Sequence, residues 1–180
     1  MSIYIEIDGD ATRPQLSNPS DIVVIPHVCN NIKKFGAGFT NSLNRTFGKG
    51  PYETYMKMDC GSSNGLKNFL GGISVCNIKN EGKIYVVNMI AQEGIIGALN
   101  PKPIKYWALM HCMERVKEFI GGLRSENPVP GINNFSRDVV IHCPKFGSQL
   151  SAGNWSLIKE LIEEIWVDSD IDVVVYNYKK

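Results

Sequence analysis

Residues 21–28 of this 180-residue chain have the sequence DIVVIPHV. The apolar run from Ile22 to Ile25 is continuous, which is typical of a strand buried on both faces inside a parallel or mixed sheet. Residues 171–176, IDVVVY, show the same pattern around Val173–Val175. Two such strands need helices on both sides of the sheet, so these segments favour an α/β fold.

Strand and helix patterns alternate through the rest of the chain, which predicts helices covering a mostly parallel sheet. The short EGK turn at residues 81–83 predicts that the strands on either side of it are antiparallel. A polar loop is predicted over residues 124–135, after a helix that we expect to end at Gly121-Gly122. The predicted strands are Ser2–Ile7, Asp21–Val28, Ile73–Ile78, Ile84–Ile90, Asp138–Cys143 and Ile171–Tyr176; the predicted helices are Gly38–Phe47, a short one from Pro51, Pro103–Leu123 and Asn154–Val167.

Charge and composition narrow the function classes. Nineteen Lys and Arg against eighteen Asp and Glu leave a net charge of +1, so bulk charge does not favour general nucleic-acid binding. A polyanionic partner must be held by local groups instead. The length and the absence of repeats or linkers predict a single domain over residues 1–180.

The cysteines are five in number, widely spaced and mostly inside apolar runs, which is typical of reduced thiols in a cytoplasmic protein. The first ten residues lack the basic and apolar regions of a signal peptide, and no apolar stretch approaches the ~20 residues needed to span a bilayer. We therefore expect a soluble protein that is not secreted.

Two glycine-rich segments follow buried strands and precede helices: Lys34–Phe39 (KFGAGF) and Phe146–Gly153 (FGSQLSAG). Glycines at such turns let phosphate oxygens approach backbone N–H groups at a helix N-terminus. The crevice beyond the carboxyl ends of the strands is the expected ligand site of an open α/β sheet. We therefore predict that both turns face one slot that holds a diphosphate. The first is not a dinucleotide fingerprint, because Asn41 occupies its third glycine position.

His27 stands at the end of the second strand, just before the first glycine turn. Strand alternation predicts that His27, Cys29 and Asn31 share one face, with Val28 and Asn30 on the other. A histidine there has a near-neutral pKa and can orient or activate a water, while the Asn side chains suit ribose hydroxyls. The alternative is a partly buried histidine whose polar atoms are satisfied within the fold.

Five pieces in this order resemble the macrodomain family, in the branch that contains terminal ADP-ribose protein glycohydrolase and the yeast ADP-ribose-1″-phosphate phosphatase. The resemblance extends from Ile5 to Tyr176 and implies a three-layer α/β/α sandwich that binds ADP-ribose. The matching pieces are Ile7–Thr12, His27–Asn30 with Gly36-Ala37-Gly38, Val87–Gln92, Cys143–Leu150 with Trp155, and Val175-Tyr176.

The resemblance also implies roles for particular residues. Asp10 would accept a hydrogen bond from the adenine amino group beside Ala11, and Tyr176 would pack against the base. The first glycine turn would line the distal ribose and diphosphate, and the second would bind phosphate. The remaining ligand-binding candidates are Asn30, Asn31, Gly36, Ala37, Gly38, Phe39, Phe146, Gly147, Ser148, Gln149, Leu150 and Ser151.

The sequence departs from the glycohydrolase branch, which uses a lysine after the central strand and an acid in the second loop. Ile90 lies near the first of those positions and Ser151 at the second. His27 resembles the phosphatase-like histidine, so we expect it to act as general base or water-orienting group, assisted by Asn30. The expected reaction, without metal or cofactor, is hydrolysis of ADP-ribose-1″-phosphate or removal of ADP-ribose from modified macromolecules. The alternative is a non-catalytic ADP-ribose reader.

Two other site chemistries compete with this hypothesis. Each histidine has a cysteine nearby, which invites a zinc site, but adjacent strand residues such as His142 and Cys143 point to opposite faces, and no CxxC or HExxH spacing occurs. Cys29 beside His27 would be a nucleophile only with a lowered thiol pKa. Trp107, Trp155 and Trp166 fall on the apolar sides of predicted helices and are expected in the core.

Overall fold

The computed structural model describes residues 2–19, 21–58, 70–78, 83–126 and 139–178. Strands and helices alternate, as the sequence predicts, and one short 3-10 helix precedes the last strand. The strands are β1 (Tyr4–Asp8), β2 (Ile22–Asn30), β3 (Ile73–Asn77), β4 (Ile84–Gln92), β5 (Val139–Pro144) and β6 (Val173–Asn177); the helices are α1 (Phe39–Phe47), α2 (Gly50–Met56), α3 (Tyr106–Glu126), α4 (Trp155–Ile165) and η2 (Val167–Ser169).

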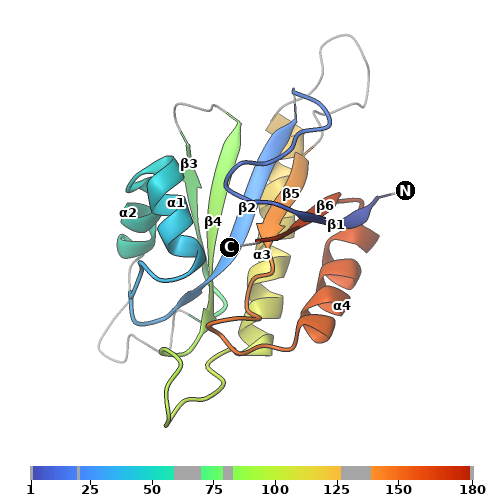
Figure 1. The fold of residues 1–180 in the computed structure, drawn as a ribbon. Helices are drawn as coiled ribbons and strands as arrows, with labels where there is room; N and C mark the ends of the chain where they lie inside the picture. The colour runs from blue at the N-terminus through green and yellow to red at the C-terminus, as the bar shows by residue number, and fades with distance from the viewer. Residues whose placement is uncertain (1, 20, 59–69, 79–82, 127–138, 179–180) are drawn as a thin grey trace.

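The six strands form one mixed sheet in the order β1-β6-β5-β2-β4-β3 (Figure 1). Every neighbouring pair is parallel except β3 and β4, which are antiparallel, as their short connection predicts. The α/β fold class is therefore confirmed. Because five strands run the same way, the carboxyl ends of β2, β4, β5 and β6 meet at one edge of the sheet.

Helices cover both faces of the sheet (Figure 1). One face packs on α3 and α4 in the main core, to which β2 contributes Ile22 and Val24. The other face buries Val23 and Ile25 of β2 against Leu43 of α1. The continuous apolar run in β2 is thus explained by burial on both sides, which is what its composition predicts.

The long helix α3 begins and ends about three residues later than predicted. It continues through Gly121 and Gly122 to Glu126, so the prediction that these glycines end it was wrong. Both are exposed, with open space where a side chain would lie, so the helix tolerates them. The expectation of a core Trp107 was also wrong, because its side chain is 54% exposed, whereas Trp166 is fully buried. Most of the predicted 124–135 loop lies outside the described residues.

The four described cysteines are free and buried, as expected; Cys60 lies outside the described residues. Within the described ranges, no cluster of His, Cys, Asp and Glu is arranged to hold a metal ion. His142 and Cys143 do point to opposite faces, because His142 bonds Tyr176 while Cys143 lies in the main core. No described helix is long and apolar enough to cross a membrane.

The two glycines within α3 give a stability prediction. Alanine at Gly121 or Gly122 should raise the free energy of unfolding by about 0.5–1 kcal/mol, because alanine loses less backbone entropy in a helix. Denaturant unfolding measures this change. Gly71→Ala is the opposite control: Gly71 has φ +87°, and an added Cβ would lie 3.1 Å from the Cβ of His111, so that variant should lose stability. Destabilisation by both α3 substitutions would contradict the helical assignment.

Candidate functional site

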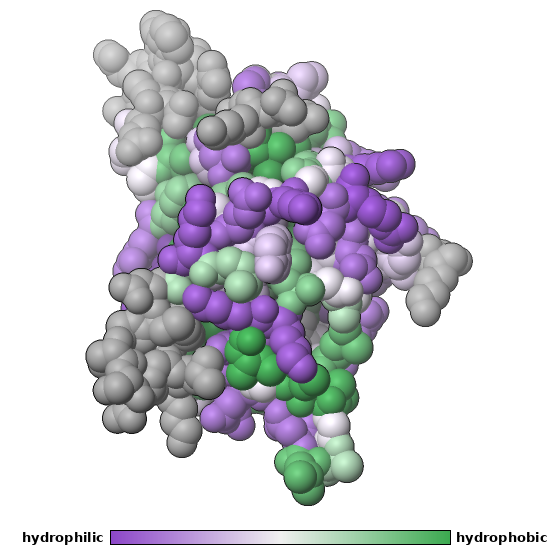
Figure 2. All heavy atoms as spheres, turned by 90° about the vertical axis from the view of Figure 1, so that its left-hand side faces the viewer, coloured by the Kyte–Doolittle hydropathy of each residue, from purple (hydrophilic) through white to green (hydrophobic). Residues whose placement is uncertain are grey.

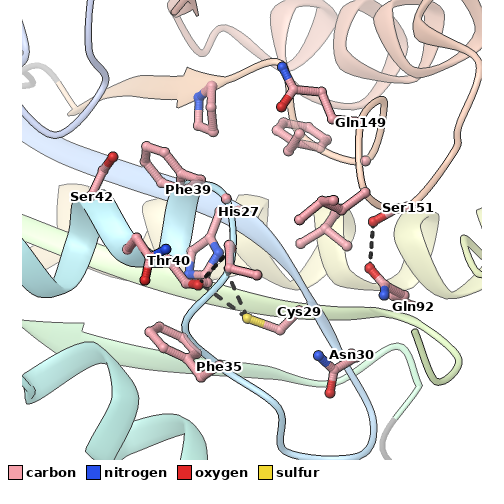
Figure 3. A pocket seen from close by; sticks show the side chains of 18 of the residues that line it. His27, Cys29, Asn30, Phe35, Phe39, Thr40, Ser42, Gln92, Gln149 and Ser151 are labelled. Atoms are coloured by element: carbon pink, nitrogen blue, oxygen red, sulfur yellow. Dashed lines mark hydrogen bonds between the residues drawn. The ribbon is translucent and has the colours of Figure 1, made fainter. Parts of the chain in front are cut away.

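A cleft of about 1060 Å³ lies where the carboxyl ends of β2, β4, β5 and β6 meet. The two glycine turns lie on its opposite sides, one after β2 and the other after β5 (Figure 3). The prediction that both turns face one slot is therefore confirmed. The lining also includes Tyr176 and Asn177 at the end of β6, Tyr178 directly after it, and Gln92 at the end of β4.

The first glycine turn leads directly into α1, so the N-terminus of this helix lies at the cleft. Gly38 is the N-cap of α1, with φ +62° and ψ −131°, a conformation that favours glycine. It has no side chain with which to cap the helix, and Asn41 N donates to Gly38 O, so the N–H groups of Phe39 and Thr40 are the ones in the first turn that can face a ligand. Thr40 stabilises the turn, because its Oγ1 accepts a hydrogen bond from Gly36 N and donates one to Ala37 O.

The second turn closes on itself. Gly153 N donates to Gly147 O over 2.7 Å, and Ala152 N donates to Gln149 O over 2.9 Å. A Cβ at Gly153 would lie 2.5 Å from that same Gly147 oxygen, so the closed loop requires glycine there. Asn154 then caps α4, its side chain accepting a hydrogen bond from Ser156 N. The turn is a preformed backbone concavity, a shape suited to anions.

Four basic side chains line the cleft: Lys33, Lys34, Arg45 and Lys145. None of the described lining residues is acidic. Lys145 forms an ion pair with Glu6 at 2.9 Å, and Lys33 donates to the carbonyl oxygens of Met56 and Met58. A chain of nearly zero net charge therefore presents a locally positive slot, which attracts anions.

Tyr176 anchors the β6 end of the cleft. Its hydroxyl accepts a hydrogen bond from Gln15 N at 2.8 Å and lies 2.9 Å from His142 Nδ1. The Tyr176 ring also contacts the backbone near Gly9, where an added Cβ would approach it to 3.1 Å. These contacts join the segment after β1, which carries Asp10, to the wall of the cleft.

Neither a protein-family model nor a curated protein sequence matches this chain. Solved structures do match it along almost its whole length. A Bacteroides thetaiotaomicron protein of unknown function is 30% identical, with 97% of this chain and 98% of that chain covered and a TM-score of 0.76. A macrodomain protein from Streptomyces coelicolor is 26% identical, with 97% and 98% covered and a TM-score of 0.69. This chain belongs to the macrodomain family.

A more distant structure shares the macrodomain fold. Thermosipho africanus DarTG in complex with ADP-ribose is 11% identical and has a TM-score of 0.57, with 88% of this chain and 38% of that chain covered. At this identity the likeness concerns the fold alone.

Most of the candidate residues come together in the macrodomain's cleft, and four do not line it. Asp10 Oδ1 accepts hydrogen bonds from the N and Oγ1 of Thr12. Ala11 is buried near Tyr176, Asn31 Oδ1 accepts from Gly94 N, and Ser148 Oγ donates to Lys145 O. The candidates that line the cleft are His27, Asn30, Gly36, Ala37, Gly38, Phe39, Phe146, Gly147, Gln149, Leu150, Ser151 and Tyr176.

His27 lies at the floor of the cleft, with its ring 5.6 Å from that of Phe39 and 6.0 Å from that of Phe35 (Figure 3). His27 Nε2 is 2.7 Å from Asn88 Oδ1. The amide nitrogen of Asn88 donates to Pro51 O and Ser74 Oγ, so Asn88 offers an acceptor and His27 Nε2 carries the proton. Burial lowers the pKa of His27 to about 4, so the ring is neutral at physiological pH.

The neutral ring has its remaining lone pair on Nδ1, which is 3.7 Å from Cys29 Sγ. As predicted, His27 and Cys29 lie on the same face of β2. Burial raises the pKa of the Cys29 thiol well above its ordinary value, which does not favour Cys29 as a nucleophile. This geometry supports the satisfied-histidine alternative, and a catalytic His27 stays a prediction.

Asn30 organises the first loop. Its Oδ1 accepts hydrogen bonds from Ile32 N, Lys34 N and the Tyr55 hydroxyl, while its Nδ2 donates to Lys34 O at 2.6 Å. These contacts fold residues 30–34 into a compact turn that points the following glycines at the cleft. A register shift in β2 at Cys29 and Asn30 accompanies the turn.

At the β4 end, Ser151 Oγ donates to Gln92 Oε1 at 2.6 Å, and both side chains are buried (Figure 3). Ile90, which lies near the family's lysine position by resemblance, belongs to a small apolar cluster with Tyr55 and Cys29 and does not line the cleft. The β4 residue that faces Ser151 is thus Gln92. The glycohydrolase branch has a lysine and an acid in this region, whereas this chain has the neutral, hydrogen-bonded pair Gln92 and Ser151.

Sequence reasoning missed Gln92, Arg45 and Lys145 as lining residues. Gln92 was hidden because the predicted strand ended at Ile90, two residues too early. Arg45 lies two turns into α1, where only the orientation of the helix brings it to the cleft. For Lys145 a signal was present, since it directly precedes the second glycine turn.

The buried histidines give a pH prediction. Burial lowers the pKa values of His27 and His142 from 6.5 to about 4, so between these values the unfolded chain binds more protons than the folded one. The free energy of unfolding should therefore fall as pH drops from about 6.5 to 4, by on the order of 2–3 kcal/mol for each histidine. His27→Gln should flatten this pH dependence in denaturant titrations, whereas replacement of the exposed His111 by Gln should not. Parallel curves for wild type and His27→Gln would count against a neutral, buried His27.

Proposed function

We propose that this macrodomain binds ADP-ribose along the cleft, with adenine at the β6 end, the diphosphate between the two glycine turns and the distal ribose at the β4 end. The observation that carries the proposal is the placement of both turns on one slot with basic and no acidic lining among the described residues. A diphosphate matches both the N–H groups and the positive charge. The ADP-ribose in the Thermosipho structure, which shares the fold, supports the same ligand.

At the adenine end, the resemblance assigns Asp10, Ala11 and Tyr176 to the base. Thr12 holds the Asp10 carboxylate through Oδ1, and Gln15 N bonds the Tyr176 hydroxyl, so these contacts fix the base-recognition groups relative to the slot. At the other end, Asn30 and the Gln92–Ser151 pair offer polar atoms near the distal ribose.

A pair of glycines at the two ends of α1 provides a matched test. Gly38 and Gly48 both have positive φ, at +62° and +69°, but Gly38 faces the cleft and Gly48 is remote from it, with nothing within 4 Å of an added Cβ. Isothermal titration with ADP-ribose should show wild-type binding, with affinity reduced at least about tenfold in Gly38→Ala and unchanged in Gly48→Ala. ADP should compete, whereas adenosine should compete poorly. Failure of the wild type to bind ADP-ribose would refute the proposal.

Hydrolysis at the distal ribose is the second candidate. The observation that favours it is the position of His27 in the floor of the cleft, where a neutral imidazole can orient a water molecule through a hydrogen bond. The reaction would release phosphate from ADP-ribose-1″-phosphate or detach ADP-ribose from a modified macromolecule. Without turnover, the same cleft makes the protein an ADP-ribose reader.

The two candidates separate in a phosphate-release assay with ADP-ribose-1″-phosphate. If His27 is catalytic, His27→Ala should lose turnover by on the order of a hundredfold while ADP-ribose affinity changes little. His142→Ala is the control, because it also removes a buried histidine, but one that does not line the cleft. Wild-type binding without release of phosphate, and without release of ADP-ribose from a modified macromolecule, would establish the reader. Full turnover in His27→Ala would exclude the catalytic role.

A further inference from the structure

The loop that joins β4 to α3 carries an apolar tip. Ile95 and Ile96 are 44% and 45% exposed, and Leu99 is fully exposed. We call these three side chains the apolar tip. The loop forms the lowest point of the molecule in Figure 1, and the space-filling view shows hydrophobic side chains gathered at the same end (Figure 2). Clustered exposed aliphatic groups on a soluble protein commonly mark an interaction site.

The tip is held in place by backbone and amide hydrogen bonds rather than by burial. Gly97 and Asn100 exchange backbone hydrogen bonds of 3.1 and 3.0 Å, and Asn100 Nδ2 donates to the carbonyl oxygens of Glu93 and Ile95. Its apolar side chains are therefore presented on a loop whose backbone is held by its own hydrogen bonds. Preorganisation of this kind lowers the entropy cost of binding.

The base of the loop is bonded directly to the distal end of the cleft. Gln92 Nε2 donates to Gly94 O, and Gln92 Oε1 accepts from Ser151 in the second glycine turn. Ile104 N donates to Ser151 O, and Asn31 Oδ1 accepts from Gly94 N. Leu150 of the second glycine turn, 49% exposed, is a further aliphatic side chain at the cleft. A group attached to the distal ribose would leave the cleft beside this loop.

The absence of charge at the tip favours a polypeptide as the group attached to the distal ribose. No residue from Gly94 to Pro101 is charged. The charged groups at the base are engaged locally, with Lys105 paired to Glu93 at 3.1 Å and Lys102 lying over the ring of Tyr106. Nucleic-acid partners are bound largely through their phosphates by Lys and Arg, which the tip does not provide. Aliphatic side chains instead suit apolar residues of a peptide.

We propose that the apolar tip Ile95-Ile96-Leu99 is a docking surface for the polypeptide that carries ADP-ribose, so that the protein recognises the modification together with its carrier. This inference rests on the proposed function, because the position of the distal ribose defines where the carrier emerges.

The test compares free ADP-ribose with a synthetic apolar peptide bearing one ADP-ribose attached through its distal ribose. Wild type should bind the modified peptide at least about tenfold more tightly than free ADP-ribose, and the double variant Ile95→Ser, Leu99→Ser should lose that gain while binding free ADP-ribose normally. Ile3→Ser is the matched control: Ile3 is 50% exposed and precedes β1 at the opposite edge of the sheet. It should behave as wild type.

The remaining outcomes all bear on the inference. Equal affinity of wild type for the modified peptide and free ADP-ribose would overturn it and leave the proposed function intact. Tighter binding of an ADP-ribosylated oligonucleotide than of the peptide would overturn the choice of carrier. A wild-type dimer that the double variant dissociates, seen by sedimentation, would assign the tip to self-association instead. Failure to bind free ADP-ribose would remove both proposals.

Discussion

Parallel pairing of β2 with both β4 and β5 is the constraint on which the site depends. β2 can occupy that central place because its side chains are apolar on both faces, with Ile22 and Val24 against the main core and Val23 and Ile25 against α1. Parallel neighbours end at the same edge, so the loops after β2 and β5 emerge side by side. The two glycine turns then face each other, and Leu150 of the second turn lies against Gly38 of the first, where an added Cβ would lie 3.0 Å from the Leu150 Cδ1. The cleft is a consequence of strand direction, and its chemistry is supplied by the loops.

The polar residues beneath the cleft form a connected network. Asn88 accepts from His27 and donates to Pro51 and Ser74, linking β2, β3, β4 and the start of α2. A second buried hydrogen bond of this kind lies at the end of β2, where the Tyr55 hydroxyl donates to Asn30 Oδ1. Buried polar groups of this kind are stable only when each has its partners. His27 and Asn30, whose residue types suggest catalysis, therefore also have a structural role, because their hydrogen bonds hold the strands and loops around the cleft in place.

Patterns that reflect burial were readable from the sequence, and patterns that reflect three-dimensional orientation were not. The apolar runs located β2 and β6, and the glycine segments located both walls of the cleft, because each signal is local. The prediction that α3 ends at Gly121 was wrong because the low helix propensity of glycine is a weak preference, which the packing of α3 overrides. Trp107 misled because it falls on the exposed side of that helix. Arg45 and Gln92 line the cleft only because of how α1 and the end of β4 are oriented, which no local pattern encodes.

The pairing of β1 with β6 bears on when the protein can complete its site during synthesis. These edge strands are parallel partners from Tyr4–Val173 to Asp8–Asn177, and Ile3 N bonds the carboxylate of Asp172, 169 positions along the chain. Contacts of such long sequence separation form late in folding. β1 must therefore wait, without its sheet partner, until β6 has left the ribosome. A nascent chain stalled before β6 would hold the glycine turns but lack the wall formed by Tyr176.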